Sequence, residues 1–117
     1  MTDTVTTWVE NYRRAWESND PDDIRALFTE DAVYFTSPHE AEPRRGHEEI
    51  VAGWLRDRDE PGTTTFEWHP VVVTDEVAVV QGRTVYLNGP GYKNLWVIRL
   101  APDGRASEYT EWYMEEK

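Results

Sequence analysis

The spacing of apolar residues changes once along the chain, near residue 63, and this change constrains the fold more than any other feature. Before it, apolar residues recur three and four positions apart in segments 5–16 and 50–55, which predicts amphipathic helices. After it, apolar and polar residues alternate in segments 64–73, 76–87, 92–100 and 105–114, which predicts four strands. Helices first and strands afterwards indicate an α+β domain.

Short breaks between these segments predict how the elements connect. Asp20 and Pro21 begin a second, short helix that carries Ile24, Leu27 and Phe28, since proline is favoured in the first helical turn. Residues 32–35 form a short strand, and segment 36–46, with two prolines and a glycine, is a loop. The turns at 74–75, 88–91 and 102–104 are short, which favours antiparallel neighbours. We therefore expect three helices packed on a curved antiparallel sheet, in one domain of residues 1–117.

Charge and composition exclude several classes of function. The formal net charge is -11, and such a surface repels both nucleic-acid phosphates and anionic lipid. The chain has no cysteine, which excludes disulfides and thiol catalysis. No apolar run approaches the length of a membrane span, and residues 1–20 lack the apolar core of a signal peptide. We expect a cytoplasmic protein that binds neither nucleic acid nor membrane.

Three segments carry a resemblance to a known family. They are LFTEDAVY (27–34), PRRGHEEI (43–50) and WVIRLAPDGRASEYTEWYM (96–114). With the order of elements, they make the whole chain resemble the nuclear transport factor 2-like (NTF2-like) superfamily, and within it the SnoaL-like, or polyketide cyclase-like, domain. The resemblance implies the cone-shaped, cystatin-like fold. The superfamily holds ketosteroid isomerases, epoxide hydrolases, dehydratases, polyketide cyclases and many non-enzymes, so the fold alone does not decide the reaction.

The resemblance to ketosteroid isomerases can be followed residue by residue. In these enzymes a tyrosine of the first helix donates a hydrogen bond to the developing oxyanion, and Tyr12 occupies that position. The position of the general base falls at Thr36 or Ser37, neither of which can act as that base. The second oxyanion donor, a protonated aspartate, corresponds to Trp96. Of the three functional groups of the isomerases, only the tyrosine thus has a counterpart in this sequence.

A second comparison implies a different set. Limonene-type epoxide hydrolases use an Asp–Arg–Asp set, and the corresponding residues are Val85, Arg83 and Glu111. In both comparisons the position of Glu111 faces the cavity. Because strand side chains alternate, Tyr109 and Tyr113 share that side.

Glu111 is therefore the expected catalytic acid or base, with Arg83 and Tyr12 as its catalytic partners. Among apolar side chains its pKa would rise toward neutrality, whereas an ion pair with Arg83 would keep it ionised. The other interpretation is a glutamate that faces solvent or a dimer interface. Arg83 likewise is either a partner of Glu111 in the cavity or a charge that points outward from its strand.

Aromatic residues are expected to line a ligand pocket because they combine apolar faces with polar edges. Asn94 is the expected polar anchor, and His39 lies in the loop that can cover the cavity mouth in this fold. The histidines are scattered, so we expect no metal site and no cofactor. The expected lining residues are Trp16, Tyr34, Trp54, Tyr92, Asn94, Trp96, Tyr109 and Tyr113.

Three hypotheses about function stay open. The first is a cofactor-independent isomerase, cyclase, dehydratase or hydrolase that acts on an apolar oxygenated or polyketide-like ligand. The second is a module that binds a small hydrophobic ligand without turnover, and the third is a structural dimer. Trp112 has the opposite strand parity to Glu111, so we expect a homodimer through the outer face of the sheet.

Overall fold

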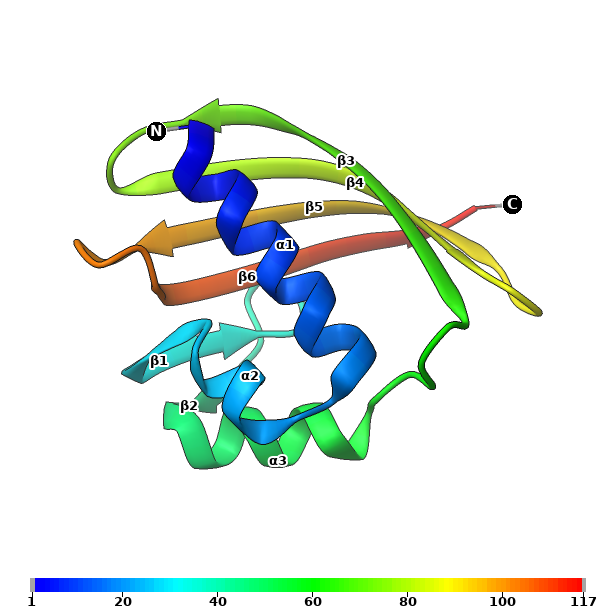
Figure 1. Cartoon of the computed structure of the whole chain (residues 1–117), viewed down its shortest axis with the longest axis horizontal. Coiled ribbons are helices and arrows are strands. Elements are labelled where there is room, and N and C mark those ends of the chain that lie inside the picture. Colours follow the sequence, from blue (N-terminus) through cyan, green and yellow to red (C-terminus); the bar gives the residue numbers. More distant parts are fainter. Residues whose placement is uncertain (1, 117) are drawn as a thin grey trace.

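The computed structural model describes residues 2–116, and side chains from residue 4 to residue 116. It confirms the three helices and the four C-terminal strands (Figure 1). The elements are α1 (Thr2–Ser18), α2 (Pro21–Arg25), β1 (Phe28–Phe35), β2 (Arg44–Arg45), α3 (Gly46–Arg56), β3 (Thr64–Val73), β4 (Val77–Tyr86), β5 (Gly91–Leu100) and β6 (Ala106–Glu115).

The six strands form one sheet in the order β2-β1-β6-β5-β4-β3. Strands β3 to β6 are the expected antiparallel meander. Strand β1 pairs with β6 in parallel, and the two-residue β2 pairs antiparallel with β1. The sequence did not predict either of these pairings, and β1 begins at Phe28, four residues earlier than expected. The first strand thus brings its side chains beside the C-terminal strand.

The sheet is curved, and α1 crosses its concave face, while α2 and α3 lie beside β1 (Figure 1). The apolar stripe of α1 faces the sheet, where Val5, Trp8 and Val9 are buried. The indole Nε1 of Trp8 donates to the carbonyl oxygen of Leu27 (3.0 Å), which ties the middle of the helix to the start of β1. Burial of this stripe drives the packing because each fully buried large apolar side chain contributes about 2 kcal/mol.

A glycine in β4 lets an aromatic ring lie flat against the sheet. A Cβ atom on Gly82 would stand 2.6 Å from the ring of Phe66, closer than any real contact. Phe66 in turn stacks on Trp96, with ring centroids 4.8 Å apart. Gly82 therefore helps to set the position of Trp96 on the concave face. No helix among residues 2–116 is both long and apolar enough to cross a membrane.

Candidate functional site

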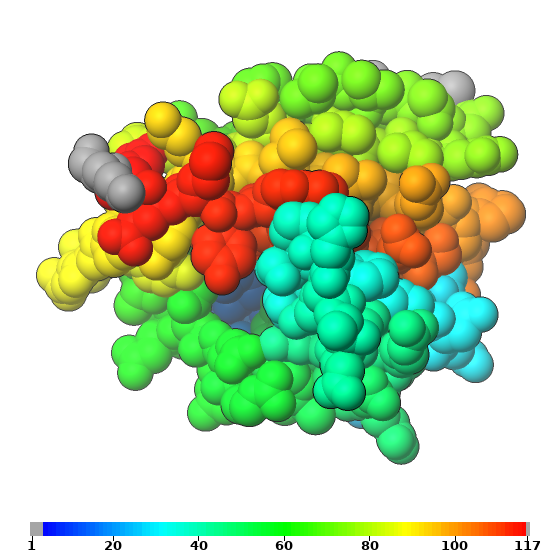
Figure 2. Space-filling model, turned by 180° about the vertical axis from the view of Figure 1, so that it is seen from behind, coloured from blue at the N-terminus to red at the C-terminus, as the bar shows by residue number. Residues whose placement is uncertain are grey.

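A cavity of about 340 Å³ opens between the end of α1, α3 and the concave face of the sheet. Figure 2 shows the molecule hollowed at this place, between the green α3, the cyan segment that precedes it and the red C-terminal strand, with blue atoms of α1 at the bottom. Its lining residues are Tyr12, Trp16, Tyr34, Arg44, Trp54, Asp57, Arg58, Asp59, Thr84, Tyr86, Tyr92, Asn94, Trp96, Glu111 and Tyr113.

Glu111 is held in this cavity by two neutral donors. It lies directly opposite Trp96 in the β5–β6 ladder. Its Oε2 accepts hydrogen bonds from Asn94 Nδ2 (2.8 Å) and Trp96 Nε1 (3.4 Å). The second oxygen, Oε1, accepts no hydrogen bond within the described residues. One carboxylate oxygen is thus fixed, and the other is available to a ligand.

The surroundings of Glu111 favour its protonated form. Burial raises its pKa above the ordinary value, because desolvation penalises the charged carboxylate. The hydrogen bonds from Asn94 and Trp96 act in the opposite direction, and the nearby charge of Asp59 adds to the rise. The net direction is upward, so this carboxyl group takes up a proton at a higher pH than a free glutamate does.

A residue of the neighbouring strand orients the side-chain amide of Asn94. Its Oδ1 accepts a hydrogen bond from Thr84 Oγ1 (2.8 Å), and both side chains are buried. Because the amide oxygen is occupied in this way, the amide nitrogen faces Glu111. Thr84 and Asn94 come from the adjacent strands β4 and β5, so the sheet itself holds the carboxylate in place.

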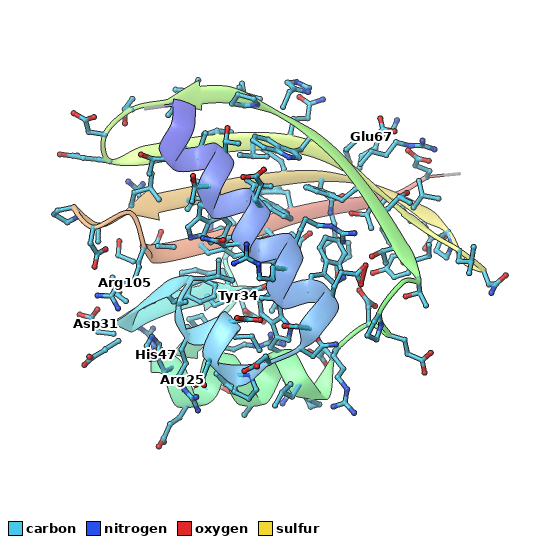
Figure 3. The ribbon with its side chains drawn as sticks, viewed as in Figure 1. Arg25, Asp31, Tyr34, His47, Glu67 and Arg105 are labelled. Atoms are coloured by element: carbon cyan, nitrogen blue, oxygen red, sulfur yellow. The ribbon has the colours of Figure 1, made fainter. Side chains whose placement is uncertain are left out.

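Three tyrosines lie close together where α1 packs on the sheet. The hydroxyls of Tyr12 and Tyr34 are 3.0 Å apart and hydrogen-bonded, and Figure 3 shows Tyr34 in the interior of the molecule under the helix. The hydroxyl of Tyr109 is buried and has no hydrogen-bond partner among the described residues. Desolvation raises the pKa of all three phenols, and the charge of Glu111 adds to it. They stay neutral, and a neutral phenol can donate a hydrogen bond to a ligand oxygen.

Asp59 is another carboxylate on the cavity wall, and no pattern in the sequence indicates it. Its Oδ2 accepts hydrogen bonds from Trp16 Nε1 (2.8 Å) and the hydroxyl of Tyr86 (3.1 Å). Asn19 Nδ2 donates to the backbone oxygen of Asp59 (3.1 Å). The residue lies in the irregular segment after α3, where no periodicity shows which side chains face inward. Its half-buried position is held by these long-range hydrogen bonds.

Arg83 does not reach the cavity, which corrects the expected pairing with Glu111. It alternates on β4 with the buried Thr84 and therefore points to the opposite face of the sheet, where its side chain is 55% exposed. Its Nε and Nη2 donate to the two carboxylate oxygens of Glu116 (2.7 and 2.9 Å). Asn94 and Trp96 take the place that an arginine would have beside Glu111.

The other expected lining residues fall into three groups. Trp16, Tyr34, Trp54, Tyr92, Asn94 and Trp96 line the cavity, and Tyr113 does so at its mouth, where it is 57% exposed. Tyr109 is fully buried and does not line the cavity. His39 is exposed in the loop and also lies outside the lining set. The described side chains contain no group of three or more acidic or histidine residues that could hold a metal ion.

A family model matches this chain. The model of the SnoaL-like domain matches residues 9–112, which is most of the chain. The protein therefore belongs to the SnoaL-like domain family, within the NTF2-like superfamily. The comparison with curated proteins gives no match.

Solved structures share the fold at low sequence identity. An NTF2-like protein of unknown function from Burkholderia xenovorans LB400 aligns with a TM-score of 0.76 and 15% identity, over 98% of this chain and 86% of that chain. A ketosteroid isomerase-like protein from Erwinia carotovora atroseptica SCRI1043 aligns with a TM-score of 0.70 and 17% identity, over 98% and 97%. A steroid delta-isomerase from Pseudomonas aeruginosa aligns with a TM-score of 0.64 and 17% identity, over 95% and 80%. At these identities the likeness shows the fold alone.

Proposed function

We propose that this protein is a cofactor-independent, isomerase-type enzyme that moves a proton on a small apolar molecule bearing a carbonyl or hydroxyl group. The observation that carries the proposal is the environment of Glu111. This carboxyl group lines an aromatic cavity, has a raised pKa, and presents one oxygen without a hydrogen-bond partner. General acid–base catalysis requires such a group, with a pKa brought toward the operating pH.

The proposed reaction uses Glu111 as both base and acid. Oε1 takes a proton from a carbon next to the ligand carbonyl, and the electron pair of the broken C–H bond moves to the carbonyl oxygen. The protonated carboxyl group then returns the proton to another carbon, which completes an isomerisation. Tyr12 or Tyr34 donates a hydrogen bond to the oxygen on which negative charge develops. The bonds to Oε2 keep the carboxylate oriented throughout.

Asp59 supports this role through its charge. It raises the pKa of Glu111, because a second negative charge on the same cavity disfavours ionisation of the first. Replacing Asp59 by asparagine keeps an oxygen that can accept from Trp16 and Tyr86 but removes the charge. We expect the pKa of Glu111 to fall in this variant, as measured by NMR titration of its carboxyl carbon.

The alternative is a binding module that holds the same kind of ligand without turnover. One observation favours it. Thr36, one of the two residues at the position of the isomerase base, has its backbone nitrogen and hydroxyl bonded to the carboxylate of Glu40 (2.9 and 2.6 Å). The group that catalyses the reaction in the isomerases therefore has no direct substitute at that position, and any turnover depends on Glu111.

An assay that does not require the natural substrate separates the enzyme from the binding module. In the base-promoted ring opening of 5-nitrobenzisoxazole, removal of one carbon-bound proton and cleavage of the N–O bond occur together, and the product is a coloured phenolate that carries a nitrile. We expect Glu111→Gln to lower kcat/KM at least about 100-fold, the scale of one general base. The rate should rise with pH around a midpoint above about 4.3, the ordinary value for glutamate.

Glu67→Gln is the matched control, since Glu67 is exposed on β3, away from the cavity (Figure 3). It should leave the rate unchanged. If the wild-type protein binds the probe, seen by quenching of tryptophan fluorescence, but does not accelerate the ring opening beyond Glu111→Gln, the protein is a binding module.

A further inference from the structure

A second hollow lies next to this cavity, along the β4–β5 hairpin. It has a volume of about 410 Å³. It shares three wall residues, Asp59, Tyr86 and Tyr92, with the cavity that contains Glu111. The two spaces are therefore neighbours that share part of one wall. We call the outer space the hairpin groove; its lining residues are Asp59, Thr63, Tyr86, Leu87, Asn88, Gly89, Pro90 and Tyr92.

The hairpin groove presents apolar surface that the protein itself does not cover. The side chain of Leu87 is 72% exposed, the highest value among the large hydrophobic residues that are exposed in the described part of the chain. A single exposed leucine is ordinary. Here, however, it stands beside Pro90 and two tyrosine rings at the entrance to a cavity, and apolar surface gathered around such an entrance indicates ligand contact.

The groove is held in shape by the backbone of the hairpin. The Leu87 N–H donates to the carbonyl oxygen of Thr63 (2.8 Å), and the Tyr86 N–H donates to that of Pro90 (3.4 Å). The hydroxyl of Tyr86 is bonded to Asp59 across the entrance. These bonds connect the hairpin to the segment that precedes β3, so the groove keeps its position relative to the cavity.

A row of tyrosine rings leads from the cavity into the groove. The centroids of Tyr113 and Tyr92 are 6.0 Å apart, and those of Tyr92 and Tyr86 are 5.7 Å apart, with each pair edge to face. Tyr113 lines only the cavity, whereas Tyr86 and Tyr92 line both spaces. A molecule with its polar group beside Glu111 thus meets continuous aromatic surface on the way out.

We propose that the ligand of this site is an amphiphile, with an oxygen-bearing head in the cavity and a neutral alkyl chain in the hairpin groove. The proposal rests on the proposed function, because it places the reacting head beside Glu111. The occupant of the groove must be joined to a head group inside a cavity of about 340 Å³. An alkyl chain meets this condition better than a protein segment does. The net charge of -11 disfavours a tail that ends in an anion.

Binding of 4-alkylphenols, from methyl to hexyl, tests the proposal. The phenol hydroxyl can donate to Oε1 of Glu111, and the para chain points away from it. For the wild-type protein we expect affinity to increase about two- to fourfold per added methylene, the transfer value for one CH₂ or somewhat less in an open groove. Leu87→Ser should remove most of this dependence on chain length and leave the affinity for 4-methylphenol within about twofold of wild type.

Val72→Ser is the matched control. Val72 is 51% exposed and lines none of the hollows described above, so its replacement should leave the dependence on chain length intact. Equal loss in both variants would mean that the chains bind nonspecifically, and the proposal would be wrong. It would also be wrong if Leu87→Ser kept the full dependence.

The proposed function can hold even if the proposal of an amphiphilic ligand is wrong. If 4-methylphenol binds and Glu111 drives the ring opening of 5-nitrobenzisoxazole, but longer chains bring no gain in the wild-type protein, the head site stands and the groove is not used. If 4-methylphenol does not bind and Glu111→Gln does not change the ring opening, both proposals are overturned.

Discussion

At the scale of single residues, Glu111 contributes less to the stability of the folded protein at neutral pH than at acidic pH. Its pKa is raised in the folded state, so the folded protein holds this proton more tightly than the unfolded chain. The resulting stabilisation is complete below the unfolded value of about 4.3 and is lost as pH rises through the folded pKa. The cost of burying the carboxylate is therefore fully present at pH 7 if the folded pKa lies below 7.

We predict that Glu111→Gln is more stable than the wild-type protein at pH 7, because burial raises the pKa of Glu111 and its charged form is penalised there. The amide keeps the shape and an acceptor oxygen for Asn94 but carries no charge. The advantage should shrink as the pH is lowered to about 4. Urea unfolding at several pH values measures it, with Glu67→Gln as the exposed control. A variant less stable than wild type at pH 7 would contradict the prediction.

The tyrosine cluster predicts opposite results for two similar substitutions. Tyr12→Phe breaks the bond to the buried Tyr34 hydroxyl and should lower the free energy of unfolding by about 1 to 2 kcal/mol. Tyr109→Phe removes a buried hydroxyl that has no partner among the described residues, so it should be neutral or stabilising, within about 0.5 kcal/mol. Denaturant unfolding of both variants decides this, and similar losses would show that Tyr109 is bonded.

Strand alternation explains which site residues were predictable from the sequence. The structure places Asn94, Trp96 and Glu111 on the cavity side of β5 and β6, as expected from the family resemblance of Glu111 and Trp96 and from strand alternation. The sequence of β4 left two possibilities for Arg83, which could have faced either side. Asp59 was missed because its place depends on hydrogen bonds from Trp16 and Tyr86, which lie 43 and 27 residues away in the sequence.

At the scale of elements, Asn19 joins three segments that frame the cavity. Its backbone, with a φ of 52°, ends α1 in the left-handed region, which asparagine tolerates better than most residues do. Its side chain accepts from Trp54 Nε1 of α3 (3.1 Å) and donates to the backbone of Asp59 (3.1 Å). The end of α1 therefore positions the segment that carries Asp59.

Two substitutions separate the backbone role of Asn19 from its side-chain role. Asn19→Gly keeps the left-handed backbone but loses both side-chain bonds, at a cost of about 1 to 2 kcal/mol. Asn19→Ala also strains the backbone and should cost about 1 kcal/mol more. Both should speed amide hydrogen exchange in residues 57–62. Unchanged exchange there, with stability lowered in both variants, would show that the segment is held by other contacts.

The arrangement of elements was predictable where contacts are local. Connections of three to five residues favour the antiparallel pairing of β3 to β6, which the structure shows. The parallel pairing of β1 with β6 joins residues more than 70 positions apart, for example Phe28 with Ala106. No turn specifies such a contact. It results from burial of Phe28 and Tyr34 against the core, which is a property of the whole fold.

At the scale of the whole molecule, the outer face of the sheet is the surface that we propose for a homodimer. Trp112 and Met114 stand on the side of β6 opposite Glu111 and are 40% and 66% exposed. Leu95 lies across from Trp112 in the ladder. The ion pairs Arg99–Glu108 and Arg83–Glu116 lie on the same sheet. Exposed apolar residues accompanied by paired charges of both signs are typical of a surface that two copies can share.

We predict that the protein is dimeric and that Trp112→Asp makes it monomeric. At a twofold interface each substitution places two like charges in the buried contact, and an unpaired buried charge costs several kcal/mol. Sedimentation equilibrium over a range of protein concentrations measures the change. Leu87→Ser is the control, since it removes an exposed leucine from the hairpin and should leave the dimer intact. Because Trp112 and Glu111 point to opposite faces, Trp112→Asp should retain the Glu111-dependent ring opening of 5-nitrobenzisoxazole. A wild-type protein that is monomeric at about 100 μM would exclude a dimer of ordinary strength.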